Sequence, residues 1–97
     1  MSKPKSAIIT GSSSGIGHAI AEALAGAGMN VVLNGIEPAD QVETARLAIE
    51  KKFGVKAIYS PANMMKSEGV RSLVAAAEAA FGQVDVLVNN AGIQFVS

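Results

Sequence analysis

A glycine-rich turn, Thr10-Gly11-Ser12-Ser13-Ser14-Gly15-Ile16-Gly17, directly follows the apolar run at residues 7–9. Gly11 and Gly15 would let the backbone turn sharply and approach a ligand with no Cβ in the way. The helix that follows offers unpaired N–H groups and the positive end of its dipole, which favour a pyrophosphate. Gly17 would allow close packing of the helix on the strand. The alternative is a glycine-rich turn that holds no ligand.

A second apolar run, at residues 86–88, ends in the polar turn Asn89-Asn90-Ala91-Gly92. Little in the sequence supports metal binding or catalysis by a nucleophilic triad. His18 is the single histidine and cysteine is absent, so neither a metal cluster nor a Ser/His/Asp triad is expected. We interpret His18 as a partly exposed helix side chain.

Apolar, β-branched runs alternate with stretches of helical period along the chain, which is typical of a parallel sheet with crossover helices. Strands are predicted at residues 6–10, 30–34, 55–60 and 84–89. The first helix should start near Gly15 and end at Gly26 or Gly28. The second should follow Pro38, in its first turn, and stop at Gly54, and the third should run from Ser67 to Gly82.

The helical periods predict which side chains face the sheet. The expected apolar stripes are Ile16, Ile20, Ala23, Leu24 and Ala27; Val42, Ala45, Ile49 and Phe53; and Val70, Leu73, Val74, Ala77 and Phe81. Right-handed crossovers then predict the strand order 3-2-1-4, with the first two helices on one face and the third on the other. Both polar turns would lie where the strand order reverses, which is where ligands bind in such folds.

The composition fits a single domain spanning residues 1–97, and the alternation of strands and helices makes it an α/β domain of the Rossmann-type doubly wound kind. Apolar residues make up 49% of the chain, and eight basic side chains balance eight acidic ones. With no basic stripe, nucleic acid is not an expected partner. The polar N-terminus resembles neither a secretory signal nor a membrane anchor, so a cytoplasmic location without membrane contact is expected.

Together, the glycine turn and the Asn89 to Gly92 turn resemble those of the short-chain dehydrogenase/reductase family. The segments at residues 31–35 and 90–94 are similar in particular to bacterial 3-hydroxybutyrate dehydrogenases. The resemblance implies that the cofactor is bound by Gly11, Ser13, Ser14, Gly15, Ile16, Gly17, Asn90, Ala91 and Gly92. Asn89 would instead tie the fourth strand to its neighbour.

The resemblance also implies an adenine-binding position after the third strand and a ribose-binding segment after the second. The family usually has Asp at the first of these, where this chain has Asn63 followed by Met64. Gly35 and Ile36 fall in the second. Neither this segment nor Ser14 supplies a cation for a 2′-phosphate, which favours NAD over NADP. Glu37 is either a ribose ligand or a solvated loop charge.

Gln94 matches the position at which hydroxybutyrate-type enzymes bind the substrate carboxylate, the alternative being a surface amide. No catalytic residue is assigned. The single tyrosine, Tyr59, is followed four positions later by Asn63, so the family's Tyr-x-x-x-Lys pair is missing.

We therefore interpret the chain as the NAD-binding part of a dehydrogenase for a small 3-hydroxy acid, inactive alone and homo-oligomeric when complete. The alternatives are a free-standing dinucleotide-binding module and a structural half completed by another chain.

Overall fold

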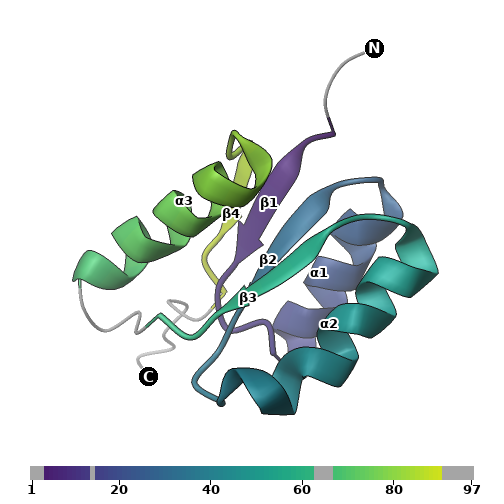
Figure 1. The fold of residues 1–97 in the computed structure, drawn as a ribbon, viewed down its shortest axis with the longest axis horizontal. Helices are drawn as coiled ribbons and strands as arrows, with labels where there is room; N and C mark the ends of the chain where they lie inside the picture. Colours follow the sequence, from purple (N-terminus) through teal and green to yellow (C-terminus); the bar gives the residue numbers. More distant parts are fainter. Residues whose placement is uncertain (1–3, 14, 63–66, 91–97) are drawn as a thin grey trace, which may run out of the picture.

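The computed structural model describes residues 4–13, 15–62 and 67–90, which form strands and helices in strict alternation (Figure 1). The elements are β1 (Ser6–Ile9), α1 (Gly15–Gly26), β2 (Asn30–Asn34), α2 (Ala39–Phe53), β3 (Ala57–Ser60), α3 (Ser67–Phe81) and β4 (Val86–Val88). Every predicted strand and helix is present. Within these residues no helix is both long and apolar enough to cross a membrane.

The four strands form one parallel sheet in the order β3-β2-β1-β4, as predicted. In register, Ile8 lies between Val32 of β2 and Leu87 of β4. Helices α1 and α2 cover one face, and α3 covers the other (Figure 1). This confirms the doubly wound α/β class and places the reversal of strand order between β1 and β4.

Alternate residues of the central strands supply the two cores on either side of the sheet. Ala7 and Ile9 of β1 pack with the α1 and α2 side, whereas Ile8 packs with Leu73 and Ala77 of α3. Burial on both faces explains why these strands are continuous apolar runs rather than alternating ones. The α3 face is less covered, because Leu87 on the outer strand β4 remains 49% exposed.

The face predicted for α1 is wrong in part. Its buried residues are Gly17, Ala21 and Ala25, whereas Ile16 is 76% exposed and Ala23 and Ala27 are also exposed. Small side chains let the helix backbone approach the sheet closely. The larger Ile20 and Leu24 pack at the edge of that contact. Close approach therefore decided the orientation of the helix, against the pattern of large apolar residues.

The remaining two stripes are closer to the prediction. Val42 and Ile49 of α2 are buried, as are Leu73 and Ala77 of α3, but Val70 in the first turn of α3 is 42% exposed. Pro38 precedes α2 instead of lying in its first turn, because its ψ of 148° is extended. At the other end Gly54 adopts a left-handed conformation and donates its N–H to the Glu50 carbonyl.

Strands β3 and β4 start later than predicted, and a side-chain hydrogen bond supplements the backbone pairing just before each of them. Lys56 N–H, just before β3, donates to the Asn30 side chain at 2.9 Å. Ser6 N–H donates to the Asp85 carboxylate at 2.9 Å, just before β4. The backbone groups at these positions are satisfied without extending the regular strand.

Candidate functional site

The glycine turn and the first two residues of the second polar turn, Asn89 and Asn90, meet at the carboxyl ends of β1 and β4. Thr10 N–H donates to the Val88 carbonyl at 3.0 Å, and the Thr10 hydroxyl donates to Asn89 Oδ1 at 3.3 Å. Asn90 Nδ2 donates to the Gly11 carbonyl at 3.2 Å. Asn89 therefore ties β4 to its neighbour, as expected, and the Asn90 side chain braces the glycine turn.

The shape of the glycine turn depends on left-handed backbone conformations. Gly11 has a φ of 60° and Gly15 a φ of 66°, values that L side chains rarely adopt. A Cβ added at Gly15 would meet no heavy atom within 4 Å. Open space thus adjoins the first turn of α1, where the helix N–H groups lack intrahelical partners and the dipole is positive. Unpaired N–H groups and a positive dipole favour an anionic group such as a pyrophosphate.

Gly17 brings α1 into contact with both polar turns. A Cβ on Gly17 would collide with the Gly11 carbonyl and would lie 2.8 Å from Asn90 Nδ2. Gly17 is also fully within the helix and buried. Gly17 is thus a point of close packing, but its nearest contacts are with the glycine turn itself and with Asn90 after β4, and not with the strand named in the prediction.

Asn34, at the end of β2, is a site residue that the sequence reasoning missed. Its Oδ1 accepts a hydrogen bond from Gly11 N–H at 3.0 Å. Its Nδ2 donates to the carbonyls of Ser60 and Ala62 at 2.9 and 3.0 Å. The available signal was a polar residue ending a buried apolar strand, which is unusual unless its side chain is hydrogen-bonded.

Ser12 completes the link between the turn and β2. Its N–H donates to the Asn34 carbonyl at 2.6 Å, and its hydroxyl donates to the Ile9 carbonyl at 2.6 Å. The N–H groups of Gly11 and Ser12 are therefore engaged within the protein, whereas the N–H groups in the first turn of α1 have no intrahelical partner. Gly11 would act on a ligand through the turn that it permits.

Glu37 lies beside the glycine turn rather than free in solvent. The Ser13 hydroxyl donates to Glu37 Oε1 at 2.7 Å. This hydrogen bond holds the pKa of the Glu37 carboxyl below its ordinary value, so the group is an anion at neutral pH. A Cβ on Gly35 would collide with the Ser13 hydroxyl and lie 2.6 Å from Glu37 Oε1. Gly35 therefore leaves room for the Ser13–Glu37 contact.

Tyr59 holds the Glu37 segment from the other side. Its hydroxyl donates to the Glu37 carbonyl at 2.6 Å. Burial raises the pKa of the Tyr59 hydroxyl above its ordinary value, and the charge of Glu37 adds to the effect. The hydroxyl keeps its proton and remains a donor at neutral pH. Tyr59 lies on β3, as predicted, and its hydroxyl helps to position the Glu37 segment.

Two isoleucines near the turn are unusually exposed. Ile16 in the first turn of α1 is 76% exposed and Ile36 after β2 is 95% exposed. Both are among the predicted cofactor contacts. Single exposed apolar residues are common, and these two lie in the first turn of α1 and directly after β2, in the segments that follow β1 and β2.

The other predicted site residues lie outside the described residues. They are Ser14, Asn63, Met64, Ala91, Gly92 and Gln94. His18 Nδ1 lies 3.3 Å from the Ser12 carbonyl oxygen, and His18 Nε2 lies 3.8 Å from the Glu22 carboxylate. Across residues 4–13, 15–62 and 67–90, no three His, Cys, Asp or Glu side chains are placed to hold a metal ion.

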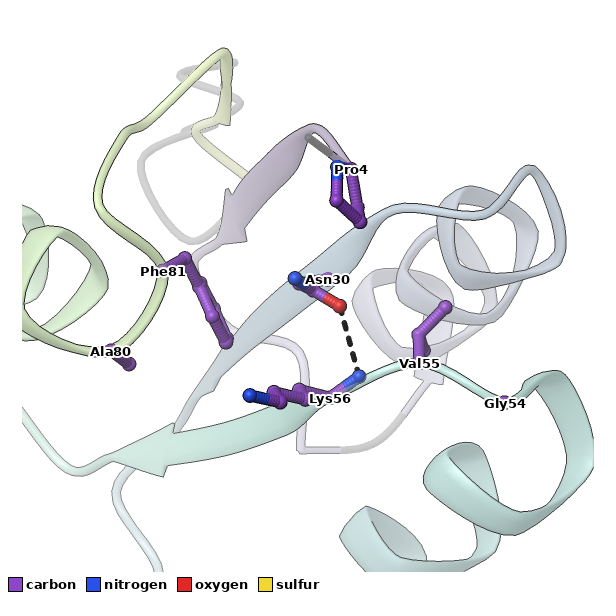
Figure 2. Close-up of a pocket in the computed structure, with 7 residues that line it drawn as sticks. All are labelled: Pro4, Asn30, Gly54, Val55, Lys56, Ala80 and Phe81. Atoms are coloured by element: carbon purple, nitrogen blue, oxygen red, sulfur yellow. Dashed lines mark hydrogen bonds between the residues drawn. The ribbon is translucent and has the colours of Figure 1, made fainter. Parts of the chain in front are cut away.

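A hollow of about 360 Å³ lies at the opposite end of the sheet (Figure 2). Its lining residues are Pro4, Asn30, Gly54, Val55, Lys56, Ala80 and Phe81. The carboxyl ends of α2 and α3 border it, and their dipoles disfavour an anion. The hollow and the polar turns are therefore separate features of the molecule.

Comparison with known proteins shows the family of the chain. The family model for short chain dehydrogenase matches residues 5–97. D-beta-hydroxybutyrate dehydrogenase of Rhizobium meliloti (strain 1021) is 45% identical over 92 residues, covering 95% of this chain and 36% of that protein. The protein of the same name from Cupriavidus necator is 43% identical over 93 residues, covering 96% of this chain and 35% of that protein.

Among solved structures, L-sorbose reductase from Gluconobacter frateurii, complexed with NADPH and L-sorbose, matches with a TM-score of 0.85 and 41% identity. The match covers 96% of this chain and 35% of the reductase. The chain thus spans 35% to 36% of the length of these relatives.

Proposed function

Since the chain belongs to the short-chain dehydrogenase family, we propose that it forms the NAD-binding part of an oxidoreductase acting on a small 3-hydroxy acid. The observation that carries the proposal is the open space at Gly15, beside the first turn of α1 and at the reversal of strand order. In an open α/β sheet this is the crevice in which ligands bind.

The residues that would hold the cofactor follow from the geometry of the turn. The start of α1, from Gly15 to Gly17, would face the pyrophosphate, with Ser13 beside it. Ile16 and Ile36 would lose solvent exposure to the bound cofactor. When bound, the nicotinamide supplies the hydride acceptor or donor of the reaction.

The choice of NAD over NADP depends on the chain's own residues, since the L-sorbose reductase structure contains NADPH. Residues 34–37 contain no lysine or arginine. Glu37 instead places a carboxylate beside Ser13 of the glycine turn. A 2′-phosphate would meet a like charge and no cation, which disfavours NADP.

We expect wild-type protein to bind NAD more tightly than NADP, and Glu37→Lys to raise the NADP-to-NAD affinity ratio. In the variant, attraction between a lysine and the 2′-phosphate replaces repulsion by Glu37. At a partly exposed position this should change the relative binding free energy by roughly 1.4 kcal/mol, or the affinity ratio by about tenfold. Calorimetry with both dinucleotides measures the ratio. Glu78→Lys makes the same charge change on α3, across the sheet, and should leave the ratio unchanged. Equal affinities in the wild type would contradict the proposed cofactor choice.

The proposed substrate class depends on Gln94. In an active enzyme that contains this chain, Gln94→Ala should raise the KM for 3-hydroxybutyrate while leaving NAD affinity nearly unchanged. A charged carboxylate short of one hydrogen bond costs about 1–3 kcal/mol. Steady-state kinetics with Gln41→Ala, an exposed glutamine on α2, provide the control. Unchanged kinetics for Gln94→Ala would assign Gln94 to the surface and remove its support for this substrate class.

A further inference from the structure

Asn34 connects the ends of three neighbouring strands through a single buried side chain. It is 2% exposed. Its amide oxygen accepts from Gly11, after β1, and its amide nitrogen donates to Ser60 and Ala62, at and after the end of β3. Its backbone N–H and carbonyl pair with the hydroxyl and N–H of Ser12. All the polar groups of Asn34 are therefore used at this edge of the sheet.

These contacts require an amide and no other group. One side of the side chain faces a donor, and the other side faces two acceptors. A carboxylate could still accept from Gly11 but would present an oxygen without a proton to the Ser60 and Ala62 carbonyls. An apolar side chain would leave all three backbone groups without this partner. Leaving a buried polar group without a hydrogen-bond partner is strongly destabilising.

The position of Asn34 relative to the proposed cofactor site suggests what these contacts do. Strands β2 and β3 lie on one side of the glycine turn, and β4 lies on the other. A dinucleotide whose pyrophosphate lies at this turn places its adenosine half over the ends of β2 and β3, because the group that binds its ribose follows β2. Through its side-chain amide, Asn34 links Gly11 of the glycine turn to Ser60 and Ala62 at and after the end of β3.

We propose that Asn34 is a positioning residue that sets the distance between Gly11 of the glycine turn and the carbonyls of Ser60 and Ala62 at and after the end of β3, and thereby the fit of the adenosine half of the cofactor. The inference rests on the proposed function. It assigns to Asn34 an effect on one half of the ligand, whereas a purely structural residue would affect both halves equally.

The experiment compares Asn34→Ala with Asn30→Ala, using AMP and nicotinamide mononucleotide as probes of the two halves. Asn30 begins the same strand, and its side chain also connects β2 to β3, by accepting from Lys56 N–H at 2.9 Å. It does so at the opposite end of the sheet. Both variants thus remove a contact between the same two strands, but only one of them adjoins the glycine turn.

We expect Asn34→Ala to lower AMP affinity by about tenfold, the factor that corresponds to 1.4 kcal/mol, with NAD affinity falling in parallel. Nicotinamide mononucleotide affinity should change less than about twofold, and Asn30→Ala should leave the ratio of the two affinities as in wild type. Ligand-observed NMR measures each affinity. Should Asn34→Ala not fold, Asn34→Asp, which keeps the acceptor for Gly11, is measured in its place.

An equal loss for both mononucleotides, or no loss for either, would overturn the role proposed for Asn34. A wild-type protein that binds neither NAD nor AMP would instead overturn the proposed function. The two failures are therefore distinguished by the wild-type measurement alone.

Discussion

Gly17→Ala is expected to lower the free energy of unfolding by about 2–3 kcal/mol, and to remove NAD binding with it. The new methyl group would enter space held by the Gly11 carbonyl and by Asn90 Nδ2. Both belong to turns braced by hydrogen bonds, so neither can move without breaking contacts at the site. Alanine is otherwise the better helix former, by roughly 0.5–1 kcal/mol, so a loss of stability isolates the effect of the collision.

Gly26→Ala in the same helix is the matched control. Its added Cβ would lie 3.4 Å from the Phe53 ring, a contact that a small side-chain shift accommodates. We expect its stability within about 1 kcal/mol of wild type. Urea unfolding followed by circular dichroism measures both variants. If Gly17→Ala unfolded at the wild-type urea concentration, α1 would not pack on the two turns as described.

Gly15→Leu is expected to weaken NAD binding by more than about 100-fold, which corresponds to 2.7 kcal/mol. The side chain would project into the open space beside α1, where the pyrophosphate is proposed to lie. The φ of 66° adds a backbone cost of about 1–2 kcal/mol to folding. The loss of NAD affinity should therefore be larger than partial unfolding of Gly15→Leu would cause by itself.

Gly54→Leu separates these two effects. Gly54 has a φ of 68°, and a Cβ there would also meet nothing within 4 Å, but it caps α2 at the far end of the sheet. The two variants should lose similar stability, and only Gly15→Leu should lose NAD binding. Calorimetry at a temperature where both remain folded makes the comparison. Undiminished NAD binding by Gly15→Leu would place the pyrophosphate elsewhere.

Much of the fold was predictable because its signals are local. Apolar runs and glycine or proline boundaries identified every strand and helix, and the handedness of crossovers gave the strand order. The face of α1 was not predictable in the same way. Counting large apolar residues favoured Ile16, whereas the close approach of Gly17, Ala21 and Ala25 to the sheet turned Ile16 outward.

By itself the sequence determined the glycine turn, the second polar turn and their meeting at the reversal of strand order. Each of these depends on residue types that the backbone conformation requires, and on a topology with few alternatives. Only the tertiary structure decided which side chains hold the turn in place. The contacts of Gly11 with Asn34 and Asn90, and of Ser13 with Glu37, join residues at least 23 positions apart. Such contacts depend on strand register and side-chain direction, which a single sequence pattern does not specify.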